Sequence, residues 1–172
     1  SEKAAYITDN WVKAGLGTQG FDTPWAVISG TTLTPETPVT LGYTGDGYEV
    51  RRTMSIDDRY LITLEDVVTN TSGSEIALQR KGVTRQHSLP DDLTNFFIIQ
   101  EGPISIVDNG YSDMKYKSLR KKGDWTETGT SGWVGLTDKY WLLAAIAPQE
   151  KTITAERRFR TINDQDVYET SY

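Results

Sequence analysis

The sequence predicts an all-β fold, an antiparallel sandwich formed by a single domain over residues 1–172. Three observations lead to this prediction. Short runs rich in β-branched and aromatic residues recur along the chain, polar turn signals separate them, and only residues 4–16 and 112–120 have even weak helical character, without convincing caps. Several short strands at regular spacing are typical of an antiparallel sandwich, although periodicity alone does not give the strand order.

The strongest strand signal lies at residues 48–56, where residue types alternate. Arg52 interrupts a face that is otherwise apolar. The pattern therefore indicates either a partly buried strand or a functional charge that points inward. The Asp-Asp-Arg sequence at 57–59 supplies turn chemistry ahead of a second strand at 60–69, so the two strands predict a hairpin.

The remaining strands follow from the same signals. Residues 75–86 predict a long strand in which Gly82 marks a bulge or a bend. Residues 95–108 predict two strands divided by a Gly-Pro pair at 102–103. Further strands are expected at residues 25–29, 38–43, 133–137, 140–147, 152–161 and 167–172.

Composition excludes several classes of protein. Hydrophobic residues make up 37% of the chain and charged residues 24%, which is normal for a folded protein and too apolar for a disordered one. The net charge of −6 argues against nucleic-acid binding, because such proteins carry a basic footprint. Cysteine is absent, which excludes disulfides and thiolate metal sites.

The apolar segments are short. The longest run, residues 140–148, is too short to cross a bilayer, which takes about 20 residues. The chain begins at Ser1 without a start methionine and stops at Tyr172 within a predicted strand. We therefore expect a piece of a longer protein, tethered to any membrane only through segments outside this chain.

Catalysis is not expected, and neither is a cofactor. The chain has one histidine, His87, and no elbow motif places a nucleophile beside it, so no Ser–His–Asp triad is predicted. Zinc sites built on histidine and cysteine need more of these ligands than the chain contains. The acidic residues lie scattered at turn positions and match no calcium-loop spacing, so we expect no metal.

The aromatic residues in the last third of the chain are candidates for binding. Four of them lie close in sequence and would line neighbouring strands: Trp125, Trp133, Tyr140 and Trp141. Stacked aromatic rings with a polar edge suit a peptide or sugar groove, whereas large residues at inward positions suit a sandwich core. We expect Trp133 and Trp141 in the core and keep Trp125 and Tyr140 as binding candidates.

Four segments of the chain resemble one protein family. Residues 132–148 read GWVGLTDKYWLLAAIAP and are similar to a block in the large periplasmic domain of bacterial YidC-type membrane protein insertases, of the YidC/Oxa/Alb family, especially those of alphaproteobacteria. Residues 33–41 (LTPETPVTL), 51–60 (RRTMSIDDRY) and 100–103 (QEGP) resemble three further blocks of that domain. All four fall in the family's order.

The resemblance implies a fold, a location and a role. The implied fold is an antiparallel β-supersandwich similar to the galactose-mutarotase and sugar-binding type. The implied location is the periplasmic face of the bacterial inner membrane, outside the membrane core that inserts proteins. Because insertion belongs to that core, the implied role of this domain is accessory: it would bind Sec translocon accessory subunits or nascent membrane proteins.

Two alternatives stay open. A mutarotase-like fold would suit a carbohydrate-binding or mutarotase-like domain, in which a histidine and a glutamate act as acid and base. His87 follows a Thr-Asn-Thr-Ser turn at 69–72 and is similar in place to the first histidine of those enzymes, but the chain has no second histidine. A groove near Arg85 and His87 would then bind a ligand without turnover. The other alternative is a structural spacer without a ligand.

Overall fold

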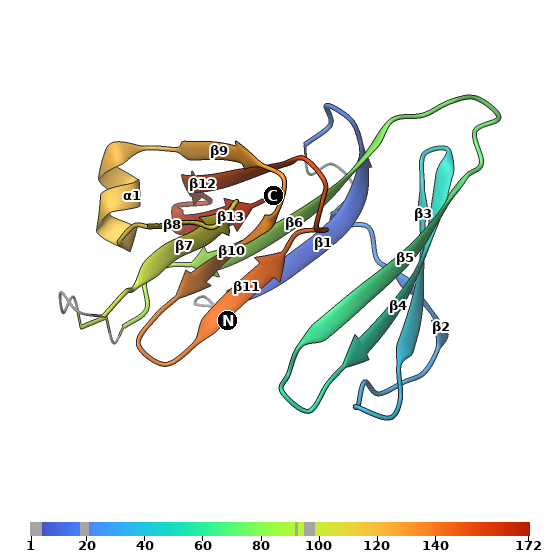
Figure 1. Ribbon diagram of the computed structural model, residues 1–172, viewed down its shortest axis with the longest axis horizontal. Helices are drawn as coiled ribbons and strands as arrows, with labels where there is room; N and C mark the ends of the chain where they lie inside the picture. Colours follow the sequence, from blue (N-terminus) through green and yellow to red (C-terminus); the bar gives the residue numbers. More distant parts are fainter. Residues whose placement is uncertain (1–4, 18–20, 92, 95–98) are drawn as a thin grey trace. The chain divides into compact units, whose positions relative to one another are not determined.

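A computed structural model describes residues 5–17, 21–91, 93–94 and 99–172 (Figure 1). Its elements are β1 (Ala5–Lys13), β2 (Ala26–Ser29), β3 (Val39–Gly45), β4 (Tyr48–Ile56), β5 (Ile62–Asn70), β6 (Leu78–His87), β7 (Gly102–Val107), β8 (Gly110–Asp113), α1 (Tyr116–Lys122), β9 (Trp125–Gly129), β10 (Gly132–Thr137), β11 (Leu142–Ile146), β12 (Ile153–Ile162) and β13 (Gln165–Ser171). The predicted all-β class is confirmed. No helix among the described residues has the length and apolar character needed to cross a membrane.

Two compact units divide the chain. The first unit comprises Ser1–Asn10 and Lys81–Tyr172, and the second comprises Trp11–Arg80. The boundaries fall inside β1 and β6, so each of these strands contributes residues to both units. The single domain expected over the whole chain stays a prediction.

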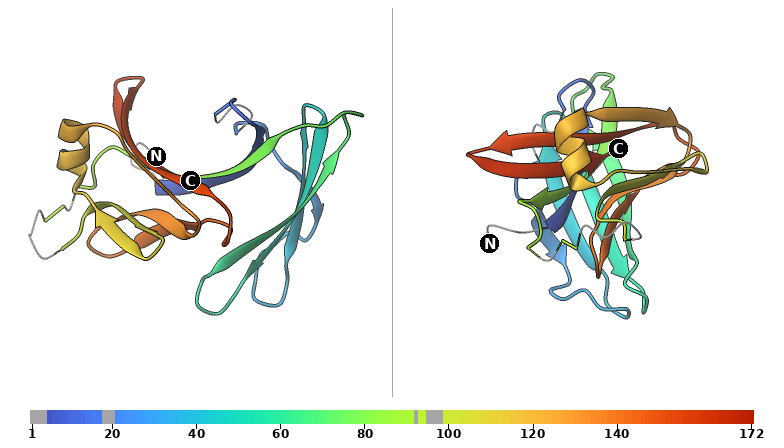
Figure 2. Two further views of the ribbon diagram at one scale, coloured as in Figure 1. Left: turned by 45° about the horizontal axis from the view of Figure 1, so that its top comes forward. Right: turned by 90° about the vertical axis from the view of Figure 1, so that its left-hand side faces the viewer.

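The first unit is a sandwich. Its five-stranded sheet has the order β1-β6-β13-β12-β9, and its four-stranded sheet has the order β11-β10-β7-β8. Figure 1 labels these strands, and Figure 2 shows them from two further sides. Side chains of both sheets meet in one buried cluster, with Val107 and Val134 from the smaller sheet and Ala155 from the larger one. A second cluster joins α1 to β10 and β13. The antiparallel sandwich is thus confirmed, while its likeness to galactose mutarotases stays a prediction.

The second unit contains one sheet, with the order β2-β3-β4-β5. Tyr43, Tyr48 and Val50 form its buried cluster. The Tyr48 hydroxyl donates a 2.6 Å hydrogen bond to the Trp11 carbonyl, and burial raises the pKa of Tyr48 to about 12. The predicted hairpin of β4 and β5 is confirmed over its full length, from the pair Tyr48–Asn70 to the last pair before the turn.

Aspartate side chains fix two of the turns. Asp57 Oδ1 accepts hydrogen bonds from two backbone N–H groups of the β4–β5 turn, both at 2.9 Å. Asp108, at the β7–β8 turn, accepts backbone hydrogen bonds at 2.8 Å from Thr130 and 3.0 Å from Ser131. The bond from Thr130 contributes most to lowering the pKa of Asp108. This carboxylate therefore ties the β7–β8 turn to the β9–β10 connection.

Two sequence predictions about elements are wrong, those for residues 5–13 and for Gly82. Residues 5–13 form β1 rather than a helix, because their aromatic and β-branched residues favour pairing with β6. The Gly-Pro pair at 102–103 begins β7, the second of the two strands predicted there, and proline is tolerated at a strand start. Gly82 does not interrupt β6, because its N–H and carbonyl pair with the backbone of Tyr172. Only glycine fits at this position, since the Tyr172 ring crosses over it and a Cβ would lie 2.5 Å from Tyr172 Cε1.

Other differences concern the ends and gaps of the prediction. Helix α1 overlaps the weak helical signal at 112–120, but the first residues of that segment belong to β8. Neither β8 nor β9 is predicted, because both are short and polar. Residues 95–98, in the first of the two strands predicted at 95–108, lie outside the described residues.

Candidate functional site

Two of the predicted binding residues lie together on the five-stranded sheet. Arg85 and His87 project from the same face of β6, and the strand partner of Arg85 on β13 is Glu169. The Arg85 side chain pairs with Glu169 at 2.5 Å. Tyr6 of β1 lies against both, with its ring stacked on His87 at 5.6 Å between centroids and its hydroxyl 3.2 Å from Arg85 Nη1. The fold therefore gathers a polar cluster around Tyr6.

Hydrogen bonds run through this cluster in one direction. Arg85 donates to the Tyr6 hydroxyl, so that hydroxyl donates onward to His87 Nε2 at 3.0 Å. His87 Nδ1 lies 3.2 Å from Gln165 Oε1, which only accepts, so the network favours a proton on Nδ1. The Gln165 amide in turn donates to Ser88 Oγ at 3.1 Å. The imidazole is thus held at both nitrogens.

The electrostatics of Arg85 follow from these partners. Burial lowers the pKa of Arg85, but the hydrogen bond with Tyr6 and the negative charge of Glu169 outweigh it, and the pKa is raised overall. A guanidinium already paired with a carboxylate and a phenol has few donors left for a ligand. A sugar or acidic group would have to displace Glu169 from it. Binding at Arg85 and His87 stays a prediction.

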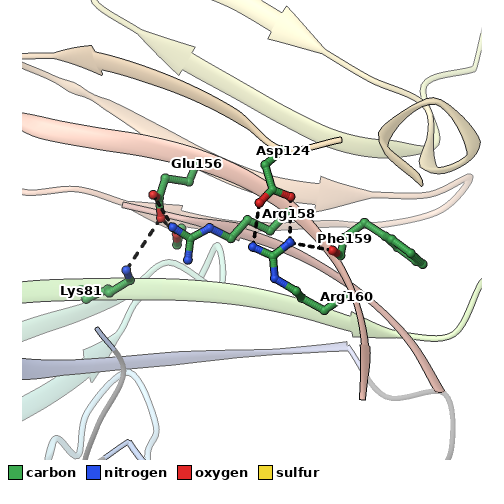
Figure 3. Close-up of polar contacts among 7 residues, drawn as sticks. Lys81, Asp124, Glu156, Arg158, Phe159 and Arg160 are labelled. Atoms are coloured by element: carbon green, nitrogen blue, oxygen red, sulfur yellow. Dashed lines mark hydrogen bonds and ion pairs between the residues drawn. The ribbon is translucent and has the colours of Figure 1, made fainter. Parts of the chain in front are cut away.

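Further ion pairs lie on the same sheet (Figure 3). Glu156 of β12 contacts Lys81 at 3.7 Å and also pairs with Arg158. Arg160 makes two hydrogen bonds to Asp124, at 2.6 and 2.8 Å, and these lower the pKa of Asp124. Each of these cations already has a carboxylate partner within the chain. These ion pairs therefore stabilise the sheet rather than presenting free charge to a ligand.

Trp125 stacks on a buried charge. The guanidinium of Arg157 lies 4.2 Å from the centroid of the Trp125 ring, and Arg157 is only 1% exposed. Arg157 Nη2 donates to Ser105 Oγ at 2.6 Å and to the Ser112 carbonyl at 2.7 Å. Burial lowers the pKa of Arg157. Trp125 is half-buried against the first core cluster, so most of its contacts are internal.

Tyr140 is the predicted residue that solvent reaches most freely, at 74% exposure. It lies in the turn before β11, where Asp138 Oδ1 accepts a 2.9 Å hydrogen bond from the Tyr140 backbone N–H. The Lys139 ammonium lies 4.8 Å from the centre of its ring. The turn therefore holds a large aromatic ring in water, far in sequence from the Arg85 cluster.

A row of apolar side chains crosses the outer face of the four-stranded sheet. Cross-strand pairing places four residues side by side, from β8 through β7 and β10 to β11: Tyr111, Ile106, Trp133 and Ile146. Tyr111 is 59% exposed and Ile146 is 54% exposed. We name these four residues the apolar row. Because the outer face of an antiparallel sheet is normally polar, an apolar row there indicates a contact surface.

The row ends at a strand edge that no other strand of the described residues covers. β11 is the last strand of its sheet, and flanking hydrogen bonds join the Ala147 N–H to the Gly132 carbonyl and the Asp138 N–H to the Trp141 carbonyl. Hydrogen-bonded positions alternate in an antiparallel ladder, so Leu142, Ala144 and Ile146 direct their backbone groups away from β10. Such an edge accepts another strand.

Sequence reasoning did not find this surface. It assigned Trp133 to the core, whereas the structure places Trp133 half-buried on the face opposite the buried Val134. The signal was the run at 142–146, which is apolar at every position although a strand with one solvated face should alternate. Which strands pair with β11 and in what register is not readable from that run.

Comparison with known proteins gives a consistent result. A family model described as YidC periplasmic domain matches residues 1–172. The chain is 40% identical over 178 residues to the membrane protein insertase YidC of Maricaulis maris (strain MCS10), covering 100% of this chain and 30% of that protein. It is 37% identical over 184 residues to the membrane protein insertase YidC of Jannaschia sp. (strain CCS1), covering 99% of this chain and 29% of that protein.

Proposed function

The chain belongs to the YidC periplasmic domain family, and we propose that it is an accessory domain that binds extended polypeptide segments during membrane protein insertion. The relatives are named membrane protein insertases, and this chain spans 30% of the length of one of them. In this proposal, the rest of such a protein carries out the insertion itself. The proposed part of this domain is to hold a partner or a substrate on the periplasmic side of the inner membrane.

One observation carries the proposal: the apolar row meets the open edge of β11. A strand added at β11 would bond to the outward backbone groups of Leu142, Ala144 and Ile146. Its alternate side chains would extend the row beyond Ile146 and cover apolar surface that now faces water. Tyr140 lies at the start of this edge and would close over the added strand.

The proposed occupants are those that the family implies, namely nascent membrane proteins and Sec translocon accessory subunits. Apolar residues dominate membrane proteins, and a chain that has not yet folded exposes them in extended form. Strand addition suits such ligands because backbone bonds give affinity without demanding one sequence. A structural spacer would not need exposed apolar side chains, whereas a binding role explains why the apolar row is not polar.

Fluorescence anisotropy with a dye-labelled peptide of alternating valine and serine tests the proposal. Ile146→Glu should raise the dissociation constant about ten-fold, because it places a charge in the row and beside the added strand. Val67→Glu is the matched control, since Val67 is a 65% exposed aliphatic residue on a strand of the other unit. A peptide with a methylated backbone should not bind. Equal binding by both variants would overturn the proposal.

A further inference from the structure

An open hollow of about 350 Å³ lies in the second unit, at the β4–β5 turn. Leu33, Pro35 and Ile56 supply apolar lining, and the Tyr60 ring joins them. Asp57 and Asp58 lie at the same site. We name it the turn hollow. It shares no residue with the apolar row or with the Arg85 cluster.

The turn presents Tyr60 in an unusual way. Tyr60 is 85% exposed and has a φ of 65°, a left-handed conformation that disfavours residues with a side chain. The turn is closed by backbone bonds from the Tyr60 N–H to the Asp57 carbonyl and from the Asp57 N–H to the Leu61 carbonyl, at 3.2 and 3.1 Å. The next residues, Leu61 and Ile62, are 51% and 49% exposed. The turn therefore presents an apolar tip to water.

The opposite wall of the hollow is also fixed. Thr34 and Thr37 form an isolated antiparallel bridge, and their hydroxyls lie 2.7 Å apart. Thr37 Oγ1 donates to the Thr32 carbonyl at 3.0 Å, and Thr34 Oγ1 donates to Glu36 at 3.0 Å. Because both walls are held by their own hydrogen bonds, little ordering is required when a ligand enters.

Charge identifies the kind of ligand. Trp11–Arg80 contains nine acidic and five basic residues, so this unit has a net charge of −4, out of −6 for the whole chain. Of its basic residues, Arg52 pairs with Asp66 and Lys13 pairs with Asp46. The charged residues next to the hollow in sequence are three acidic ones, at positions 36, 57 and 58, and one basic one, at position 59. An anionic ligand would be repelled and a cationic one attracted.

We propose that the turn hollow binds a polypeptide segment in which an apolar side chain stands next to a lysine or arginine. The apolar group fills the space between Pro35, Ile56 and the Tyr60 ring, while the cation lies against Asp58. The ring face of Tyr60 adds a cation–π contact. The site is separate from the strand edge at β11 and does not depend on it.

The test uses the acetylated and amidated tetrapeptide Lys-Leu-Phe-Lys as probe, titrated into the isotope-labelled chain and followed by NMR. Tyr60→Gly keeps the left-handed turn while removing the ring, and Asp58→Asn removes one charge without touching the capping carboxylate of Asp57. Each should weaken binding about five-fold at low salt, and the effect of Asp58→Asn should fade as salt is added. Ile162→Ala is the control, an exposed apolar residue on β12 of the other unit with no part in either proposed site, and should bind as wild type does.

Three results would overturn the proposal. One is equal binding of the probe by the Tyr60 and Asp58 variants and by wild type. Another is binding of the charge-reversed peptide Glu-Leu-Phe-Glu as tightly as the basic one. The third is a shift of the hollow's signals by vesicles of anionic lipid and not by the peptide, which would assign the site to a membrane surface. NMR reports each site separately, so Ile146→Glu should leave the peptide-induced shifts of the hollow's signals unchanged, and a failure of this site is distinguishable from a failure at β11.

Discussion

At the residue scale, the best-defined interaction in the second unit is a buried ion pair. Arg52 and Asp66 stand opposite each other on β4 and β5, with side chains 5% and 3% exposed. Two hydrogen bonds of 2.7 Å join them, and Trp11 Nε1 donates to the same carboxylate at 2.8 Å. The Trp25 ring lies 4.6 Å from the guanidinium carbon of Arg52. The arginine that interrupts the apolar face of β4 thus has a structural partner.

Removing one partner of this pair should be strongly destabilising. Asp66→Asn leaves the Arg52 charge buried without its counterion, and we expect a loss of about 3 kcal/mol in the free energy of unfolding. Urea denaturation measures it. Asp46→Asn is the control, because its pair with Lys13 is on the surface with Asp46 92% exposed, and about 0.5 kcal/mol is expected there. Similar losses in both variants would contradict this view of the pair.

The same carboxylate should make stability depend on pH. Burial raises the pKa of Asp66, but the hydrogen bond and charge of Arg52 lower it more, so the pKa falls below its ordinary value of 3.8. A lowered pKa in the folded state means that the stabilisation is complete above 3.8 and is lost as pH falls through the folded-state value. The stability difference between wild type and Asp66→Asn should therefore shrink below that pH in urea titrations. A difference that stays constant down to acid unfolding would refute it.

At the scale of elements, the sequence predicts strands best where alternation and a turn signal agree. The hairpin of β4 and β5 is predicted because Asp57 marks the turn between two alternating runs. β1 is missed because its β character depends on pairing with β6, which is distant in sequence. β9 is missed because its residues are mostly polar and it is defined by pairing with β12. Local patterns therefore identify hairpins, and distant pairings escape them.

Gly132 and Gly73 both have a positive φ, but only Gly132 also lies in close contact with a neighbouring strand. Gly132 at the start of β10 has a φ of 148°, and a Cβ there would lie 2.1 Å from the Ile106 carbonyl oxygen of β7. Gly73 has a φ of 75° and nothing within 4 Å. Gly132→Ala should lower the free energy of unfolding by more than about 3 kcal/mol, and Gly73→Ala by about 1 kcal/mol. Thermal and urea unfolding compare them, and equal losses would show that β10 and β7 are not in this close contact.

At the scale of the whole molecule, the continuity of β1 and β6 across the unit boundary bears on folding. Because each strand contributes to both units, unfolding one unit should disrupt strands of the other. We therefore expect a single transition in differential scanning calorimetry, with equal calorimetric and van't Hoff enthalpies. Asp66→Asn in the second unit should shift the entire transition downward. Two separate transitions, of which only one responds to the substitution, would mean that residues 1–172 are not one domain.

The candidate binding surface also depends on the fold of the whole molecule. Tyr140 is a candidate from the sequence because it lies close to Trp125, Trp133 and Trp141, and stacked aromatic rings with a polar edge suit a groove. The apolar row is not predictable, because it exists only once β8, β7, β10 and β11 are aligned in register. Arg85 and His87 are predicted as neighbours, and they are, but Tyr6 comes from β1 and joins them only through the fold. Composition identifies candidate residues, and topology decides which of them share a surface.

The measurement that tests the central claim most directly is site-specific photo-crosslinking in the intact insertase. A photoreactive amino acid would replace Ile146 at the β11 edge, and in a parallel strain Val67, during synthesis of an inner-membrane protein. Strand addition at β11 predicts adducts at position 146 that mass spectrometry identifies as the nascent protein or a Sec accessory subunit, with none at position 67. No adduct at 146, or the same adducts at both positions, would contradict a binding role for this edge.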